Sequence, residues 1–218
     1  MAQLESNWRT AFKANTVDLT LVIALDVSYS VDAAEFRLMR DGLAAALDSA
    51  EVEEALLTGL HGVILINVVQ WSGFQEQDTT VKWRRVGGRS DLATLAHDIR
   101  AMKRRYTGGA TDIGGALSYC HEVIKTAPEG GIRQVIDLVA DGTNNVNFGP
   151  HFIRDIIVPD KIIINGLAIT NEVDGLVDYF KENIIGGNGA FVEAAAQYVD
   201  FERAMLRKLV RETQSLMS

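Results

Sequence analysis

One stretch of this chain, residues 19–30, constrains the fold more than any other. Seven consecutive residues ending at Leu25 are apolar or nearly so, show no helical period and are rich in Leu, Val and Ile. This pattern predicts a short strand buried on both faces, as in the centre of a parallel sheet. Asp26, Ser28 and Ser30 then follow in alternation. In open α/β sheets ligands bind at the carboxyl ends of the strands, so we expect these polar side chains at a binding edge.

The rest of the chain alternates between strand-like and helix-like patterns. Apolar, β-rich runs predict strands, and amphipathic stretches with capping residues predict the helices between them. Strands are predicted at about 19–26, 63–71, 79–86, 133–140, 161–169 and 190–194. Helices are predicted at about 33–50, 51–60, 90–106, 113–126, 150–158, 176–185 and 200–216.

This alternation predicts the fold class. We expect an α/β fold: a three-layer, doubly wound, mostly parallel six-stranded sheet of order 3-2-1-4-5-6, with strand 3 an antiparallel edge strand and helices on both faces. Strands one and four are then neighbours, so Asp26 and Asp141, which end them, would face one crevice that the glycine-led Thr111 loop can reach. The 218 residues predict an N-terminal extension at 1–16 and a single domain at 17–218.

Charge and composition restrict the partners. The net charge of −8 argues against nucleic acids and anionic membranes, which need clustered Lys and Arg. The one basic cluster, residues 103–105, is read as the solvated end of the helix predicted at 90–106, where cations suit the helix dipole. No apolar run approaches the ~20 residues that a transmembrane helix needs, so we expect no membrane insertion.

The predicted cellular compartment depends on how the N-terminal residues are interpreted. Residues 1–18 lack the apolar core of a signal peptide, which taken literally predicts a cytoplasmic protein. A trimmed N terminus would look the same, and the mature protein would then be periplasmic or secreted. The single cysteine, Cys120, lies in a helical pattern and is read as a buried thiol.

Five residues near the predicted crevice share one chemistry. They are hard oxygen donors, without a thiol or an imidazole among them: Asp26, Ser28, Ser30, Thr111 and Asp141. Such a set suits Mg²⁺, Mn²⁺ or Ca²⁺ and not zinc or copper. Mg²⁺ wants octahedral geometry and keeps waters, so this set would leave a coordination position open to a carboxylate from outside.

Three motifs carry a resemblance to a known family. Residues 26–30, DVSYS, match the Asp-x-Ser-x-Ser signature of von Willebrand factor type A domains, which carry a metal-ion-dependent adhesion site. Residues 111–117 resemble the family's second loop, Thr-x-x-Gly-x-Ala-Leu, and residues 139–142 resemble its third, a strand that ends in Asp-Gly. The motifs occur in the family's order, and the resemblance spans Val17 to the C terminus. The chain also resembles a bacterial branch of this family, which has no assigned function, at residues 163–167 and 184–187.

The resemblance implies a role for each residue. Ser28, Ser30 and Thr111 would coordinate the metal directly or through water, and Asp26 and Asp141 would bind through waters or directly. Mg²⁺ is the expected ion, with Ca²⁺ or Mn²⁺ as alternatives. The implied activity is metal-dependent binding of a carboxylate on a protein or peptide partner. The family branch also favours an exported protein.

Several residues near the motifs need their own interpretation. Asp137 lies inside the fourth predicted strand, where a buried charge needs a partner, and Tyr29 stands between the serines, where it would shape access. Asp112 is predicted to cap the following helix. Asn144 and Asn145 are predicted turn formers, with hydrogen bonding around the site as the alternative.

Other functions compete with adhesion. The Asp-x-Ser-x-Ser motif alone could be a strand end with capping hydroxyls. An Asp ending strand one resembles Mg²⁺-dependent phosphatases, but Ser28 stands where their proton-donating acid would be. Dinucleotide, phosphate-loop and nucleophilic-serine motifs are absent from the sequence, so we expect no enzyme. The alternatives are a hydrolase whose metal activates water and a structural subunit whose metal holds loops together.

Overall fold

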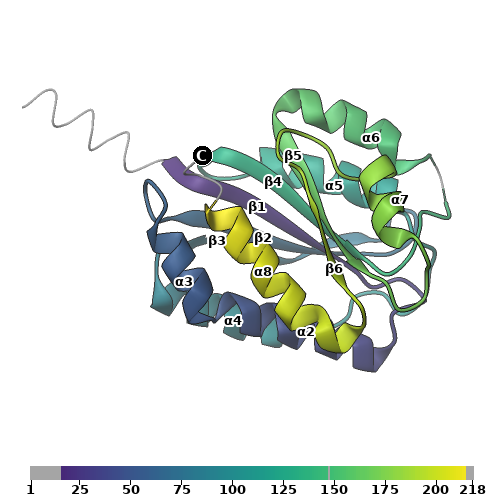
Figure 1. Ribbon diagram of the computed structural model, residues 1–218, viewed down its shortest axis with the longest axis horizontal. Coiled ribbons are helices and arrows are strands. Elements are labelled where there is room, and N and C mark those ends of the chain that lie inside the picture. Colours follow the sequence, from purple (N-terminus) through teal and green to yellow (C-terminus); the bar gives the residue numbers. More distant parts are fainter. Residues whose placement is uncertain (1–15, 147, 215–218) are drawn as a thin grey trace, which may run out of the picture.

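Six strands form one sheet that defines the architecture (Figure 1). The structure is a computed structural model that describes residues 16–146 and 148–214. The strands are β1 (Thr16–Asp26), β2 (Ile64–Trp71), β3 (Gln77–Val86), β4 (Gly130–Ala140), β5 (Ile162–Ile169) and β6 (Val192–Ala195). Their order is β3-β2-β1-β4-β5-β6, and only β3 pairs antiparallel to its neighbour. The predicted strand order and antiparallel edge are confirmed.

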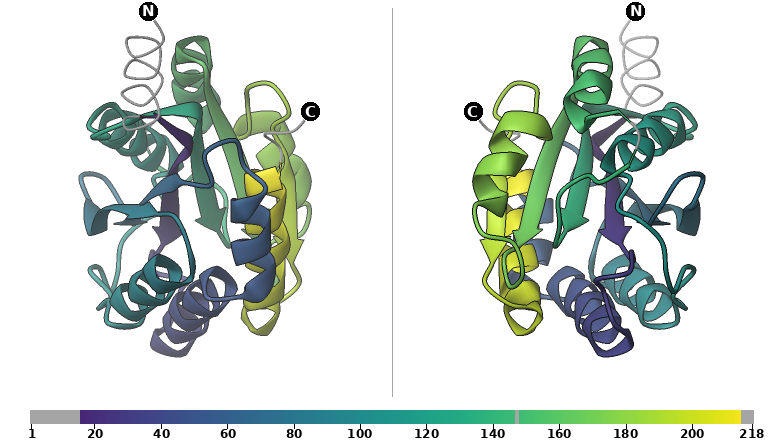
Figure 2. Two further views of the ribbon diagram at one scale, coloured as in Figure 1. Left: turned by 90° about the vertical axis from the view of Figure 1, so that its left-hand side faces the viewer. Right: turned by 90° about the vertical axis from the view of Figure 1, so that its right-hand side faces the viewer.

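Helices cover both faces of the sheet (Figure 2). They are α2 (Ala33–Leu47), α3 (Ala50–Leu57), α4 (Arg89–Arg100), α5 (Ile113–Lys125), α6 (Pro150–Ile157), α7 (Leu176–Asn183) and α8 (Phe201–Gln214). Helices α2, α3, α4 and α8 pack on one face, and α5, α6 and α7 pack on the other. Short 3₁₀ turns at Val158–Asp160 and Tyr198–Asp200 precede β5 and α8. No helix in the described ranges has the length and apolar character of a membrane span.

Strand β1 is the centre of the core, as its sequence predicts. Leu21, Ile23 and Leu25 belong to the apolar cluster on one face, and Val22 and Ala24 belong to the cluster on the other. All five side chains are buried, because parallel strands on both sides and helices above and below leave β1 no contact with water. Side chains alternate between the two faces of a strand, so a continuous apolar run satisfies both layers at once.

One helix is shorter than predicted. We predicted a helix to about residue 106, but α4 ends at Arg100, so the basic cluster at 103–105 lies in a loop and not at a helix end. The cause is the buried Gln70 side chain of β2, whose Nε2 donates to the Lys103 carbonyl oxygen at 3.1 Å. The Arg105 backbone N–H in turn donates to Gln70 Oε1 at 2.9 Å. These bonds replace those that a longer helix would make.

Both ends of the chain extend beyond the described part. Of the extension predicted at 1–16, only Thr16 is described, and it is the first residue of β1. The last helix was predicted to reach about residue 216, and positions after Gln214 also lie outside the described residues.

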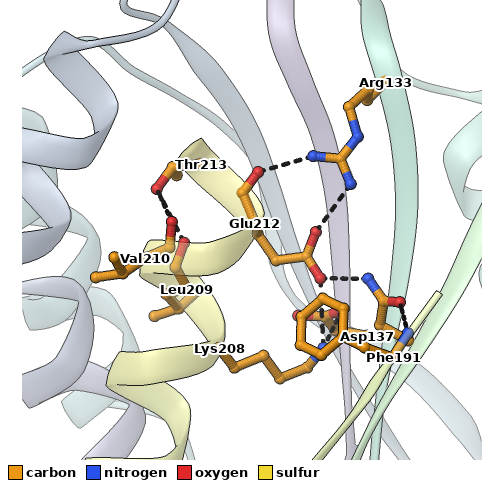
Figure 3. A network of polar contacts seen from close by, with 9 residues as sticks. Arg133, Asp137, Phe191, Lys208, Leu209, Val210, Glu212 and Thr213 are labelled. Carbon is orange, nitrogen blue, oxygen red and sulfur yellow. Dashed lines mark hydrogen bonds and ion pairs between the residues drawn. The ribbon is translucent and has the colours of Figure 1, made fainter. Parts of the chain in front are cut away.

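The buried charge of Asp137 finds its partner on α8 (Figure 3). Lys208 Nζ lies 2.7 Å from Asp137 Oδ1 and 3.4 Å from Glu212 Oε1, and all three side chains are fully buried. Arg133 adds a second cation, 3.4 Å from Glu212 Oε2. Burial raises the pKa of Asp137 to about 7, against the opposing effect of Lys208. Two acids and two bases thus join α8 to β4.

The network also reaches the neighbouring strand. Asn165 of β5 donates through Nδ2 to Glu212 and accepts the Phe191 backbone N–H on Oδ1 at 2.8 Å. The Lys208 ammonium lies 4.5 Å from the centre of the Phe191 ring, a cation–π contact. The polar contacts of α8 therefore fix the position of this helix on the sheet.

Replacing Lys208 with Met tests this network. The change leaves Asp137 buried without a cation, so we expect the free energy of unfolding to fall by about 3–5 kcal/mol. Urea unfolding measures the loss. Lys125→Met is the matched control, because Lys125 is exposed and pairs only with Glu122 within one helix; its effect should stay below about 0.5 kcal/mol. Equal stability of the two variants would contradict the assigned role.

Candidate metal centre

The carboxyl end of β1 turns away from the sheet in a defined conformation. The Ser28 backbone N–H donates to Asp26 Oδ1 at 2.7 Å, which turns the chain immediately after the strand. The Arg104 guanidinium donates to the carbonyl oxygens of Val27 at 3.1 Å and of Ser28 at 3.0 Å. This arginine therefore helps to fix the backbone of the turn that carries Ser28 and Ser30.

The structure brings the five predicted site residues together from three separate segments. Ser30 Oγ donates to Asp141 Oδ1 at 2.8 Å, and it lies 3.4 Å from Ser28 Oγ. Thr111 Oγ1 donates to Ser28 Oγ at 3.4 Å. Asp26 joins the group through the backbone of Ser28. Because β1 and β4 are parallel neighbours with Leu25 opposite Val139, the two aspartates end their strands at almost the same level.

The Thr111 loop is held by hydrogen bonds on both sides. On one side the Asp112 backbone N–H donates to the Ser72 carbonyl oxygen at 3.0 Å, just after β2. On the other side the Thr111 backbone N–H donates to Asn145 Oδ1 at 2.9 Å, and the Asn145 N–H returns a bond to the Thr111 carbonyl oxygen at 3.1 Å. The loop after β4 is thereby tied to the loop before α5.

Neighbouring residues fix the start of α5. Asp112 accepts the Gly115 backbone N–H at 2.9 Å and caps the helix, as predicted. Asn144 Oδ1 accepts the Ile113 backbone N–H at 2.8 Å. The two asparagines, 144 and 145, therefore do more than form a turn: their side chains position the Thr111 segment, which was the alternative interpretation of the sequence.

The two carboxylates are in an unfavourable environment. Asp26 and Asp141 are each 1% exposed, and Asp26 Oδ2 is buried without a hydrogen-bond partner in the described chain. Burial, and secondly the charge of Asp141, raise the pKa of Asp26 to about 8. Tyr198 donates its hydroxyl to Asp141 Oδ2 at 2.9 Å, and burial raises the pKa of that phenol, so it stays a neutral donor.

This environment fits a hard divalent cation. A cation would pair with the partnerless oxygen of Asp26 and relieve the repulsion between the two carboxylates. In the described ranges, no group of three or more His, Cys, Asp or Glu side chains could hold a metal. A metal at this edge would thus rely on hydroxyls as well as carboxylates, which is the donor set of oxygen-preferring ions.

Two residues that shape the site are missing from the sequence-based prediction. Arg104 was assigned to a solvated helix end, but it binds the backbone at the end of β1. Tyr198 lies in the turn before α8, 57 positions from its partner Asp141, and no local pattern marks it. Tyr29 does project outward between the serines, with 80% of its surface exposed.

The fold is that of a von Willebrand factor type A domain, as the motifs suggested. A family model, described as a protein of unknown function and designated DUF1194, matches residues 16–217, so the chain belongs to that family. No curated protein matches the chain in sequence.

Solved structures show the same fold at low sequence identity. Proximal thread matrix protein 1 from the mussel byssus, with a zinc-occupied metal-ion-dependent adhesion site motif, aligns with TM-score 0.63 and 18% identity over 92% of this chain and 49% of that one. A von Willebrand factor type A protein from Catenulispora acidiphila gives 0.60 and 15% over 93% and 43%. The pilus adhesin SpaC of Lactobacillus rhamnosus gives 0.62 and 14% over 93% and 30%. The chain thus spans half or less of these proteins.

The repulsion at Asp26 predicts a pH dependence of the metal-free protein. The folded-state pKa of about 8 lies above the 3.8 of an ordinary aspartate, so between these pH values the folded protein holds a proton that the unfolded chain releases. The free energy of unfolding therefore falls as pH rises through this range. In EDTA, Asp26→Asn should flatten the fall and stabilise the protein at about pH 9 by at least about 1 kcal/mol.

Urea unfolding at about pH 5 and about pH 9 measures this effect. Asp174→Asn is the control, because Asp174 is exposed and lies in a turn outside the site. Asp137, whose pKa is also raised, is present in wild type and in every variant, so the difference between wild type and Asp26→Asn isolates Asp26. An unchanged pH profile in Asp26→Asn would show that Asp26 is not strained in the metal-free state.

Proposed function

We propose that this domain is a divalent-metal-dependent protein-binding module and not an enzyme. Five oxygen-bearing residues hold the cation, and the cation accepts an acidic group from a protein partner. The proposed ligands are Asp26, Ser28, Ser30, Thr111 and Asp141. The observation that carries the proposal is the buried, partnerless Oδ2 of Asp26 next to a second buried carboxylate.

Mg²⁺ is the proposed ion, with Ca²⁺ or Mn²⁺ as alternatives. Hydroxyl and carboxylate oxygens suit these ions, and Mg²⁺ keeps waters where the protein provides few charges. The zinc in the mussel protein supports occupation of this motif by a divalent ion in the same fold. The donor set here contains neither sulfur nor nitrogen, which favours a harder ion than zinc.

A partner carboxylate completes the proposed site. Three of the five proposed ligands are neutral hydroxyls, so the ion keeps affinity for an anionic ligand from outside. The exposed Tyr29 lies beside this open position and would contact the partner. The similarity to a pilus adhesin supports a binding role, and it supports a place outside the cytoplasm.

Thermal unfolding of EDTA-stripped protein, titrated with Mg²⁺, Ca²⁺ and Mn²⁺, tests the metal site. A cation that binds only the folded state stabilises it by about 2.7 kcal/mol at about 100 times Kd. For a chain of this size we expect Tm to rise by roughly 5–10 °C. Asp26→Ala and Thr111→Ala should fold and lose the rise.

Thr107→Ala is the matched control for the threonine variant, because Thr107 is an exposed residue of the same loop. It should respond to cations like wild type. Equal Tm shifts in wild type and both site variants would place the metal elsewhere. A Thr111→Ala protein that loses stability without losing partner binding would instead favour the structural-subunit alternative.

Peptide display tests the partner. Two libraries of random peptides, one with a fixed central Asp and one with a fixed central Asn, are selected on immobilised protein in Mg²⁺ and released with EDTA. We expect EDTA-released binders from the Asp library only, because an amide carries no charge for the metal. Equal recovery from both libraries would contradict carboxylate recognition. Asp26-dependent phosphate release from p-nitrophenyl phosphate would favour the hydrolase alternative.

A further inference from the structure

A groove lies beside the candidate metal centre, on the α5 side of the sheet. It has a volume of about 410 Å³, within the range of about 300–1,000 Å³ that is typical of ligand pockets. Helix α5 contributes lining residues from Gly114 to Glu122, and among them Gly115 and Ser118 present little side-chain volume. Phe74 from the β2–β3 turn and Phe148 from the segment before α6 are among its lining residues.

The groove and the metal centre share a segment of chain. Asp112 lines the groove, and the preceding residue is the proposed metal ligand Thr111. The Asp112 backbone is bonded to Ser72, two residues before Phe74. On the other side, a side-chain carbon placed on Gly114 would lie 3.1 Å from the Phe148 carbonyl oxygen. The groove and the candidate metal centre therefore adjoin each other at residues 111 and 112.

Three exposed aromatic side chains belong to the segments that form the groove and the candidate metal centre. Phe74 is 65% exposed, Phe148 is 76% exposed and Tyr29 is 80% exposed. Each large aromatic ring can bury roughly 150–250 Å² at an interface. Apolar surface gathered next to a polar site is typical of a surface that another protein covers.

The charges of the groove restrict its occupant. The described residues that line it include no Lys or Arg and two acids that already have partners: Asp112 caps α5, and Glu122 pairs with a lysine of the same helix at 2.9 Å. A second acidic group would be repelled there, whereas a neutral ring would displace water from Phe74, Phe148 and Tyr119. The two sites thus differ in what they bind: the metal would attract a carboxylate, and the groove disfavours one.

We propose that this groove binds an apolar side chain, preferably aromatic, of the same partner segment whose carboxylate binds the metal. The inference rests on the proposed function and names the partner more closely: a segment with one acidic residue and one aromatic residue at a fixed spacing. The metal would then provide charge recognition, and the groove would provide sequence recognition.

Sequencing the EDTA-released peptides from the fixed-Asp library tests this proposal. We expect Phe, Tyr, Trp or Leu to be enriched at one constant offset from the fixed Asp. The most enriched peptide should bind the Phe74→Ala/Phe148→Ala double variant at least about tenfold more weakly than wild type, because two exposed anchors are lost. Phe152→Ala is the matched control: this aromatic is 57% exposed on α6 and does not line the groove.

The outcomes separate the groove from the metal site. The double variant should keep the full rise in Tm with Mg²⁺, which shows that its metal centre is intact. EDTA-released peptides without a constant apolar position, or with equal affinity for wild type and double variant, would overturn the groove assignment and leave the proposed function standing. Absence of EDTA-released peptides from the Asp library would overturn both.

Discussion

The structure of the candidate site depends on one constraint, the burial of two like charges at the ends of adjacent parallel strands. Asp26 and Asp141 are both almost fully buried, and their proximity and burial raise the pKa of Asp26 to about 8. A stable fold does not need this arrangement, because apolar residues would fill the same space without the electrostatic cost. The surrounding hydrogen bonds preserve it: Ser30 and Tyr198 satisfy Asp141, and the Ser28 backbone satisfies one oxygen of Asp26.

The fold meets a second buried-charge problem in the opposite way. Asp137 is three residues before the end of β4, yet it pairs with Lys208, and the acids and bases around it balance. One strand therefore carries in its interior a carboxylate that pairs with a lysine and, just past its end, a carboxylate with no ion pair among the described residues. The contrast supports a functional reason for the second, since the same chain evidently supplies counter-charges where only stability is required.

The sequence predicted the parts that depend on local pattern. The apolar run of β1 and the strand–helix alternation were enough for the fold class. The sheet order was taken from the commonest order of such folds, and the five site residues also needed the resemblance of three motifs to a known family. It did not predict features that depend on packing between distant segments. Gln70, a residue of β2, bonds the loop where α4 ends. Arg104 donates to the backbone of a residue 77 positions away in sequence. Tyr198 approaches Asp141 only because α8 lies over the sheet. In each case the fold, and not the local sequence, brings the residue to its interaction partner.

The parallel pairing of β1 and β4 also sets the order in which the site can form. Asp141 follows Asp26, Ser28 and Ser30 by more than a hundred residues, after four helices and three strands have been made. No short fragment of the chain contains the site. The proposed cation site can therefore form only after β1 and β4 have paired, so its assembly requires contacts between residues far apart in the sequence.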